Sequence, residues 1–229
     1  MKNTFKLIGI IVLAAVITFA MAACNNSANG GGSTTPGGGT LTIGATFNLS
    51  GEAATYEDPD DAAAKAAANF GYLGFYDEDT ETYLIKPLSD YLTGTPKVEI
   101  TDGKLTVTLG EPKPASMRLL IEEEMPGITV TPNNVKYFML KEFYTEDGYH
   151  GLYLDGGEYV LGALVYVEED VKINGTESNE DGQTIIWPNL SLKRGWNFLI
   201  MVGDKATETE TITYSASRTY PAGLEWVVF

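Results

Sequence analysis

Residues 97–110, KVEITDGKLTVTLG, constrain the fold more than any other stretch because they predict a β-hairpin with a single register. The Asp-Gly pair at 102–103 tolerates the positive φ angles that a two-residue type I′ turn requires. Pairing about this turn places Ile100 opposite Leu105, so apolar side chains gather on one face and polar ones on the other. We therefore expect this hairpin to cover one side of a hydrophobic core.

A second hairpin is predicted for GLYLDGGEYVLGALVYV, residues 151–167. A turn at the glycine pair 156–157 faces Leu154 with Tyr159. The second strand is almost continuously apolar up to Val167, which is typical of a strand covered on both faces.

A third hairpin is predicted for NLSLKRGWNFLIMV, residues 189–202. The loop from Lys193 to Gly195, with the glycine in the left-handed region, is a common three-residue connection. It sets Leu192 opposite Trp196.

Other segments have strand composition, and two are typical of short helices. The further expected strands are 41–48, 70–76, 127–131, 134–144, 170–174, 183–187, 210–215 and 223–229. The expected helices are 58–70, which is rich in alanine, and 116–126, which ends at a proline. We therefore expect a mainly β fold, an antiparallel β-sandwich or open barrel with one or two short helices, formed by a single domain over 41–229.

The N-terminus has the pattern of a secretory signal. Lys2 and Lys6 precede an almost wholly apolar run over 7–23 that ends in small residues, which predicts a signal peptide over 1–23. The alternative is an uncleaved transmembrane helix, because 17 apolar residues lie at the short edge of what spans a bilayer. Both interpretations predict that the rest of the chain is exported, since the cations hold the N-terminus inside.

Cys24 is the only cysteine and directly follows the signal. The sequence MAAC at 21–24 resembles the lipobox of bacterial lipoproteins. That resemblance implies that Cys24 carries a diacylglyceryl group and an N-acyl chain such as palmitate, which anchor the protein to a membrane. Asn25 stands where many lipoproteins of the inner membrane have aspartate, which by analogy favours the outer membrane or cell surface. The alternative is an ordinary signal peptide followed by a chance cysteine.

Residues 25–40, NNSANGGGSTTPGGGT, carry no charge and no large apolar side chain. We expect the segment 24–40 to be a lipidated cysteine followed by a flexible tether, whose root-mean-square reach is about 20–24 Å. Such a tether suits the connection between a lipid and a folded domain.

The charge of the chain excludes one class of partner. Removing the two lysines of the signal leaves 13 basic and 31 acidic residues, a net charge of −18. Nucleic-acid binding requires a basic surface, so we expect no nucleic-acid partner. A single cysteine also excludes an internal disulfide and a site built from several thiolates.

Two neighbouring stretches carry a second resemblance. GALVYVEEDVKINGT at 162–176 and LSLKRGWNFLI at 190–200 resemble the C-terminal part of β-sandwich domains of bacterial surface and periplasmic lipoproteins. The resemblance implies a sandwich fold and no particular activity.

The sequence offers little catalytic chemistry. His150 is the only histidine, it lies in an expected exposed loop, and no GxSxG motif accompanies it. A carboxylate-dependent, glycosidase-like hydrolase remains the alternative function, because two of the 31 acidic residues could act as acid and base.

The acidic residues form clusters that are mainly expected to be solvated loops. They lie at 56–61, 77–81, 121–125, 167–171 and 179–182. Carboxylate-rich loops are also permissive for Ca²⁺, so a calcium-stabilised surface module stays an alternative, and we expect no other cofactor.

Aromatic side chains provide the candidates for ligand contact. Trp187 precedes a proline at a strand end, and Tyr72, Phe75 and Tyr76 lie in a segment that mixes aromatic and acidic residues. Most of the 13 tyrosines are expected to pack in the core, whereas exposed ones suit stacking on sugars or gripping a protein. We therefore expect a non-enzymatic binding, adhesion or structural module whose partner, where it has one, is a protein or a glycan.

Overall fold

The structure is a computed structural model that describes most of the chain after residue 45. The described residues are 46–52, 55–56, 67–77, 82–120, 127–178, 183–204 and 211–229. The signal peptide, Cys24 and the tether expected over 1–40 lie outside these ranges. Within the described residues, no helix has the length and apolar character to cross a bilayer.

A small sheet contains the hairpin predicted at residues 97–110. Its four strands are, in spatial order, β1 (Phe47–Glu52), β7 (Lys104–Leu109), β6 (Lys97–Thr101) and β3 (Ala67–Asn69). The expected register is confirmed, because Ile100 pairs with Leu105 and the turn residues Asp102 and Gly103 have φ angles of 49° and 71°. The apolar residues of the hairpin are buried, as expected.

The larger sheet has fourteen strands among the described residues. Its main path runs through β5 (Thr82–Pro87), β4 (Tyr72–Asp77), β11 (Glu142–Tyr144), β12 (Gly151–Asp155), β13 (Val160–Val167), β16 (Gly195–Asp204), β17 (Thr211–Ser217), β15 (Thr184–Leu192), β14 (Val171–Ser178) and β9 (Ile128–Thr131). Beside this path, β10 (Lys136–Leu140) pairs with β13 and β8 (Arg118–Leu119), and β18 (Glu225–Val228) pairs with β12 and β2 (Thr55–Tyr56). Strands dominate, which confirms the mainly β class; the pairs β15–β17 and β18–β2 are parallel and the others antiparallel.

The strands β13 and β16 separate two hydrophobic cores. Leu164 and Phe198 face the first core, whereas their neighbours Val165 and Leu199 face the second. The expectation that the strand ending at Val167 is covered on both faces is therefore confirmed.

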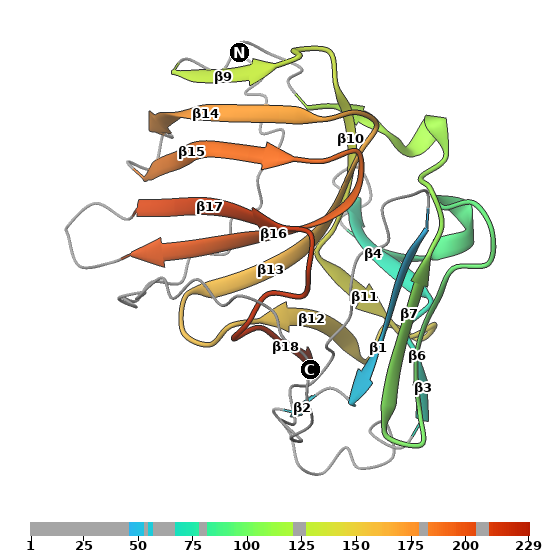
Figure 1. Ribbon diagram of the computed structural model, residues 1–229. Helices are drawn as coiled ribbons and strands as arrows, with labels where there is room; N and C mark the ends of the chain where they lie inside the picture. The colour runs from blue at the N-terminus through green and yellow to red at the C-terminus, as the bar shows by residue number, and fades with distance from the viewer. Residues whose placement is uncertain are drawn as a thin grey trace, which may run out of the picture.

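The first core has the geometry of a sandwich. It lies between the small sheet and the part of the larger sheet that contains β10–β13, β16 and β18. Figure 1 shows β1, β7 and β6 standing beside the larger sheet and running across the direction of β14–β17. The second core is enclosed by the inner faces of β9, β10 and β13–β17.

The two expected helices are wrong wherever the structure describes them. Their described parts form the strand β3 at Ala67–Asn69 and the strand β8 at Arg118–Leu119, and the remainders, 58–66 and 121–126, lie outside the described residues. The helix propensity of alanine is weak, and the pairing of β3 with β6 outweighs it. Helical segments occur as two short 3₁₀ turns: η1 (Leu88–Asp90), which lies outside both expected helices, and η2 (Pro114–Ser116), which overlaps the second expected helix at Ser116 alone.

The second hairpin forms with a different register. Leu154 pairs with Gly162 instead of Tyr159, because the connection spans 156–159. Tyr159 has a φ angle of 75° and lies inside this loop, which the backbone N–H of Gly156 closes by donating to the carbonyl of Val160.

The third hairpin is absent, and that expectation was wrong. The strands β15 and β16 are consecutive but do not pair, because β17 lies between them. Gly195 does have a positive φ angle, 90°, yet the chain uses the turn to leave β15 and cross to the far side of β17.

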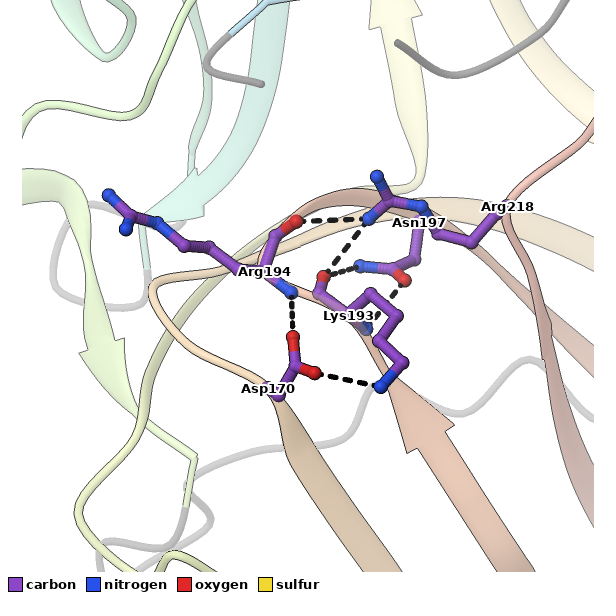
Figure 2. A network of polar contacts seen from close by, with 5 residues as sticks. All are labelled: Asp170, Lys193, Arg194, Asn197 and Arg218. Atoms are coloured by element: carbon purple, nitrogen blue, oxygen red, sulfur yellow. Dashed lines mark hydrogen bonds and ion pairs between the residues drawn. The ribbon is translucent and has the colours of Figure 1, made fainter. Parts of the chain in front are cut away.

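A polar network holds this crossing loop (Figure 2). The buried side chain of Asn197 accepts a hydrogen bond from the backbone N–H of Lys193 and donates to the carbonyl of Lys193. It also donates to the carbonyl of Gly195. The carboxylate of Asp170 accepts from Lys193 Nζ and from the backbone N–H of Arg194. Arg218 Nη1 donates to the carbonyls of Lys193 and Arg194. Most polar backbone groups of the loop thus find partners outside a hairpin ladder.

Candidate functional site

The outer face of β4, β11, β12 and β18 carries a row of aromatic side chains. Residues of these strands that face the first core include Leu73, Phe143, Leu152 and Val228. Because side chains alternate along a strand, their neighbours point to the opposite face of the sheet. The aromatic residues among them are Tyr72, Tyr144, Tyr153 and Phe229, and we call this surface the aromatic face.

Cross-strand pairing brings these four side chains together. Tyr144 lies opposite both Tyr72 and Gly151 in the sheet. Phe229 extends the ladder, since its backbone N–H and carbonyl both bond to Gly151. The ring centroid of Phe229 lies 6.1 Å from that of Tyr144 and 5.3 Å from that of Tyr153, both in edge-to-face geometry.

Gly151 makes room for the terminal ring. A Cβ atom at this position would lie 2.2 Å from Cζ of Phe229, so only glycine allows the ring to rest on the backbone of β12. Phe229 remains 47% exposed, whereas Tyr144 beneath it is buried. The aromatic face therefore presents apolar surface to solvent on a rigid sheet.

Carboxylates border the rings of the aromatic face. Tyr144 Oη donates a hydrogen bond to Glu142 on the same strand. Burial raises the pKa of Tyr72, and the charge and hydrogen bond of Glu146 raise it further, which places that carboxylate at the second tyrosine. Each of these two rings thus has a negative charge at its hydroxyl end.

The tyrosine and phenylalanine predicted at 70–76 lie on different faces. Tyr72 belongs to the aromatic face, while Phe75 points to the other side of β4 with its centroid 5.1 Å from that of Tyr91. Phe75 is 37% exposed, and Tyr91 stacks in turn on Phe138 of the first core. The side chain of Tyr76 lies outside the described residues.

Trp187 is far from these residues in the topology and packs against the second core. It is half-buried and stacks on Tyr214, with centroids 4.0 Å apart and an interplanar angle of 2°. Its Nε1 has no hydrogen-bond partner among the described residues. Burial raises the pKa of Tyr214, and the charge of Glu177 raises it further. Burial also raises the pKa of Glu177 itself.

The other sequence candidates show no assembled catalytic or metal site. His150 is half-buried in the loop between β11 and β12, and its backbone N–H donates to Thr145 Oγ1. Among the described residues, no three His, Cys, Asp or Glu side chains are grouped as metal ligands. In the cluster at 167–171, Asp170 is ion-paired with Lys193 at 2.7 Å, which lowers the pKa of its carboxyl group. The acidic side chains of 57–61, 77–81, 122–124 and 180–181 lie outside the described residues.

Tyr144, Tyr153 and Phe229 were not predicted from the sequence. The alternation in EFY and GLYLD could have indicated both tyrosines, because each lies two residues from a carboxylate and next to an apolar residue. In EWVVF the same alternation puts Phe229, four residues after Glu225, on the same side as that carboxylate. No family model, curated protein or solved structure matches the chain.

Proposed function

We propose that the protein is a lipid-anchored binding module of the cell envelope, tethered through Cys24 and exposed at the outer membrane or cell surface. The aromatic face is the observation that carries the binding function. The anchor is supported by the sequence, in which a signal peptide leads into a lipobox-like MAAC and a flexible tether. The ligand is a protein or a glycan, because both are gripped by tyrosine-rich surfaces.

The construction of the aromatic face supports contact with a ligand. Its rings are fixed by cross-strand neighbours and by backbone bonds between Phe229 and Gly151, so little side-chain entropy is lost on binding. Tyrosine presents a large apolar surface and a polar hydroxyl on two rotatable bonds, which is why it is enriched in binding sites. A face of this kind serves recognition without any bond being made or broken.

The binding function is tested with a panel of immobilised oligosaccharides and peptides. Wild type is compared with Tyr153→Ala, which removes one ring of the aromatic face, and with Tyr149→Ala as control. Tyr149 is 83% exposed but lies in the loop between β11 and β12, outside the aromatic face. We expect binding of at least one ligand to fall about tenfold in Tyr153→Ala alone. Equal losses in both variants would show that exposed tyrosines in general bind, and would refute a dedicated face.

The anchor is tested separately by growing cells with a labelled fatty acid. Wild type should incorporate the label and partition with membranes, whereas Cys24→Ala should do neither. Equal labelling of the two proteins would refute lipidation at Cys24.

A carboxylate-dependent hydrolase is a second candidate, favoured by one observation. Glu177 has a pKa raised by burial beside the Trp187–Tyr214 stack, and a carboxyl group with a raised pKa next to an aromatic surface suits a general acid. Glu177→Gln should then abolish hydrolysis of chromogenic glycosides while leaving the fold intact. Undiminished turnover in this variant would exclude Glu177 as the acid.

A further inference from the structure

We propose that the aromatic face binds a cationic, arginine-bearing segment of a partner protein. This inference rests on the proposed binding function and specifies its ligand. It follows from the charges that surround the rings, from the geometry of the tyrosine–carboxylate pairs and from what other occupants would require.

The charged side chains on the described part of the aromatic face are all carboxylates. Glu142 and Asp155 alternate onto it from β11 and β12, Glu225 from β18, and Glu146 reaches Tyr72 from the neighbouring loop. Among the described residues of β5, β4, β11, β12 and β18, no lysine or arginine shares this face. Lys86 of β5 pairs with Leu73 and therefore belongs to the opposite side.

The paired tyrosines and glutamates suit a guanidinium group. Glu142 lies opposite the half-buried Tyr153 in the ladder, and Glu146 lies at the hydroxyl of Tyr72, so an accessible ring and a carboxylate adjoin one another twice. An arginine can stack its planar guanidinium on a ring and at the same time donate two hydrogen bonds to a carboxylate. Lysine, with a compact ammonium group, satisfies only part of this arrangement.

Neutral and acidic occupants fit the charges less well. The hydroxyl groups of a neutral glycan can donate hydrogen bonds to the carboxylates, but these bonds lack the added strength that a cationic donor supplies. A second copy of the chain would bring another acidic face, and the whole chain already has 31 acidic and 15 basic residues. Like charges brought together in this way repel, so self-association through this face is disfavoured.

The test uses the purified full chain in a non-ionic detergent and three probes. The first probe is a short peptide of alternating arginine and glycine, the second is the same peptide with citrulline in place of arginine, and the third is chitohexaose. Citrulline keeps the shape of arginine and removes its charge. Binding is measured by titration calorimetry with wild type, Glu142→Gln, Tyr153→Ala and the control Glu169→Gln. Glu169 is an exposed carboxylate in the turn after β13 and lies outside the aromatic face.

The arginine peptide should bind about tenfold more tightly than the citrulline peptide or chitohexaose. Glu142→Gln and Tyr153→Ala should each weaken it about fivefold, whereas Glu169→Gln should change its affinity less than about twofold. The glutamine in Glu142→Gln keeps an oxygen that can accept the hydrogen bond from Tyr144, so this variant should stay folded. It therefore tests the inference even where Tyr153→Ala fails to fold.

Three outcomes would overturn the inference, and they differ in what they imply for the binding function. If Glu142→Gln and Glu169→Gln weaken binding of the arginine peptide equally, the attraction comes from the general acidity of the chain and not from the aromatic face. Chitohexaose binding that depends on Tyr153, with no such dependence for the arginine peptide, would overturn the cationic ligand and leave the binding function standing. A complete lack of sensitivity to Tyr153→Ala with every probe, and in the ligand panel, would refute both.

Discussion

Replacing Asn197 by alanine should destabilise the fold strongly although the residue lies outside the aromatic face. Asn197 is 1% exposed, on a strand between two cores. Its amide makes three hydrogen bonds of 2.7–2.9 Å to the backbone of the loop that joins β15 to β16. No ladder replaces these bonds, because β17 separates the two strands.

The magnitude follows from the number of bonds. Each contributes about 1 kcal/mol net, so losing three should lower the free energy of unfolding by about 3 kcal/mol. Lys193 is exposed, and water can take over part of its hydrogen bonding, which sets a lower value of about 2 kcal/mol. Asn197→Asp should be at least as harmful near neutral pH, because the new carboxylate faces two carbonyl oxygens. Its defect should shrink in acid, where the protonated group donates one bond again.

Urea unfolding measures the effect, with Asn174→Ala as the matched control. Asn174 Oδ1 accepts a single hydrogen bond, from the backbone N–H of exposed Asn189, so its loss should lower the free energy of unfolding by about 1 kcal/mol or less. The midpoint for Asn197→Ala should fall about 1 M below that of wild type. Equal midpoints for the two variants would show that the buried amide does not hold the loop.

Three further changes have distinct expected results. Gly151→Ala should force the ring of Phe229 aside and lower the free energy of unfolding by about 1–2 kcal/mol, measured in urea, with loss of the ring-current shifts of Phe229; unchanged spectra would contradict the packing. Gly103→Ala should lower the free energy of unfolding by about 1 kcal/mol through the φ angle of 71° alone, since no atom lies within 4 Å of the added Cβ; no change in stability would contradict the turn assignment. The raised pKa of Glu177 means that the folded state holds this proton more tightly, so stability is lost as pH rises above 4.5, the ordinary pKa of a glutamate side chain. Glu177→Gln should therefore raise the melting temperature near neutral pH and leave it unchanged in acid, and a difference that grows in acid would contradict the sign.

Local patterns in the sequence predicted the local structure well. The hairpin at 97–110 formed with the expected pairs because its turn and both faces are specified within the segment itself. The apolar run to Val167 correctly indicated burial on two faces, since only a strand between two cores can be apolar on both sides. The same reasoning failed for 67–69, the described part of the expected helix that forms a strand, where a helix preference of a few tenths of a kcal/mol per residue was overridden by pairing with a distant strand.

Non-local pairing explains the remaining errors. The sequence of β15, loop and β16 satisfies the rules of a hairpin, and nothing within it shows that β17, which follows later in the chain, takes the place between them. The residues that stabilise the alternative, Asp170 and Arg218, are remote in sequence from the loop. The aromatic face was not predicted for the same reason. Its residues Tyr72, Tyr144, Tyr153 and Phe229 come from four segments whose order in the sheet the sequence does not reveal.

The contrast between strands also indicates why the aromatic face is a surface and not a third core. The strand β13 and the part of β16 up to Gly203 are enclosed on both sides and contain no charged residue. The strands β11, β12 and β18 have the first core on one side only, and each places a carboxylate among the residues of its other side. Buried carboxylates require compensation, so this face is built to meet water or a charged partner. The aromatic residues of this face belong to neither core, and the proposed contact with a ligand would give them a role outside core packing.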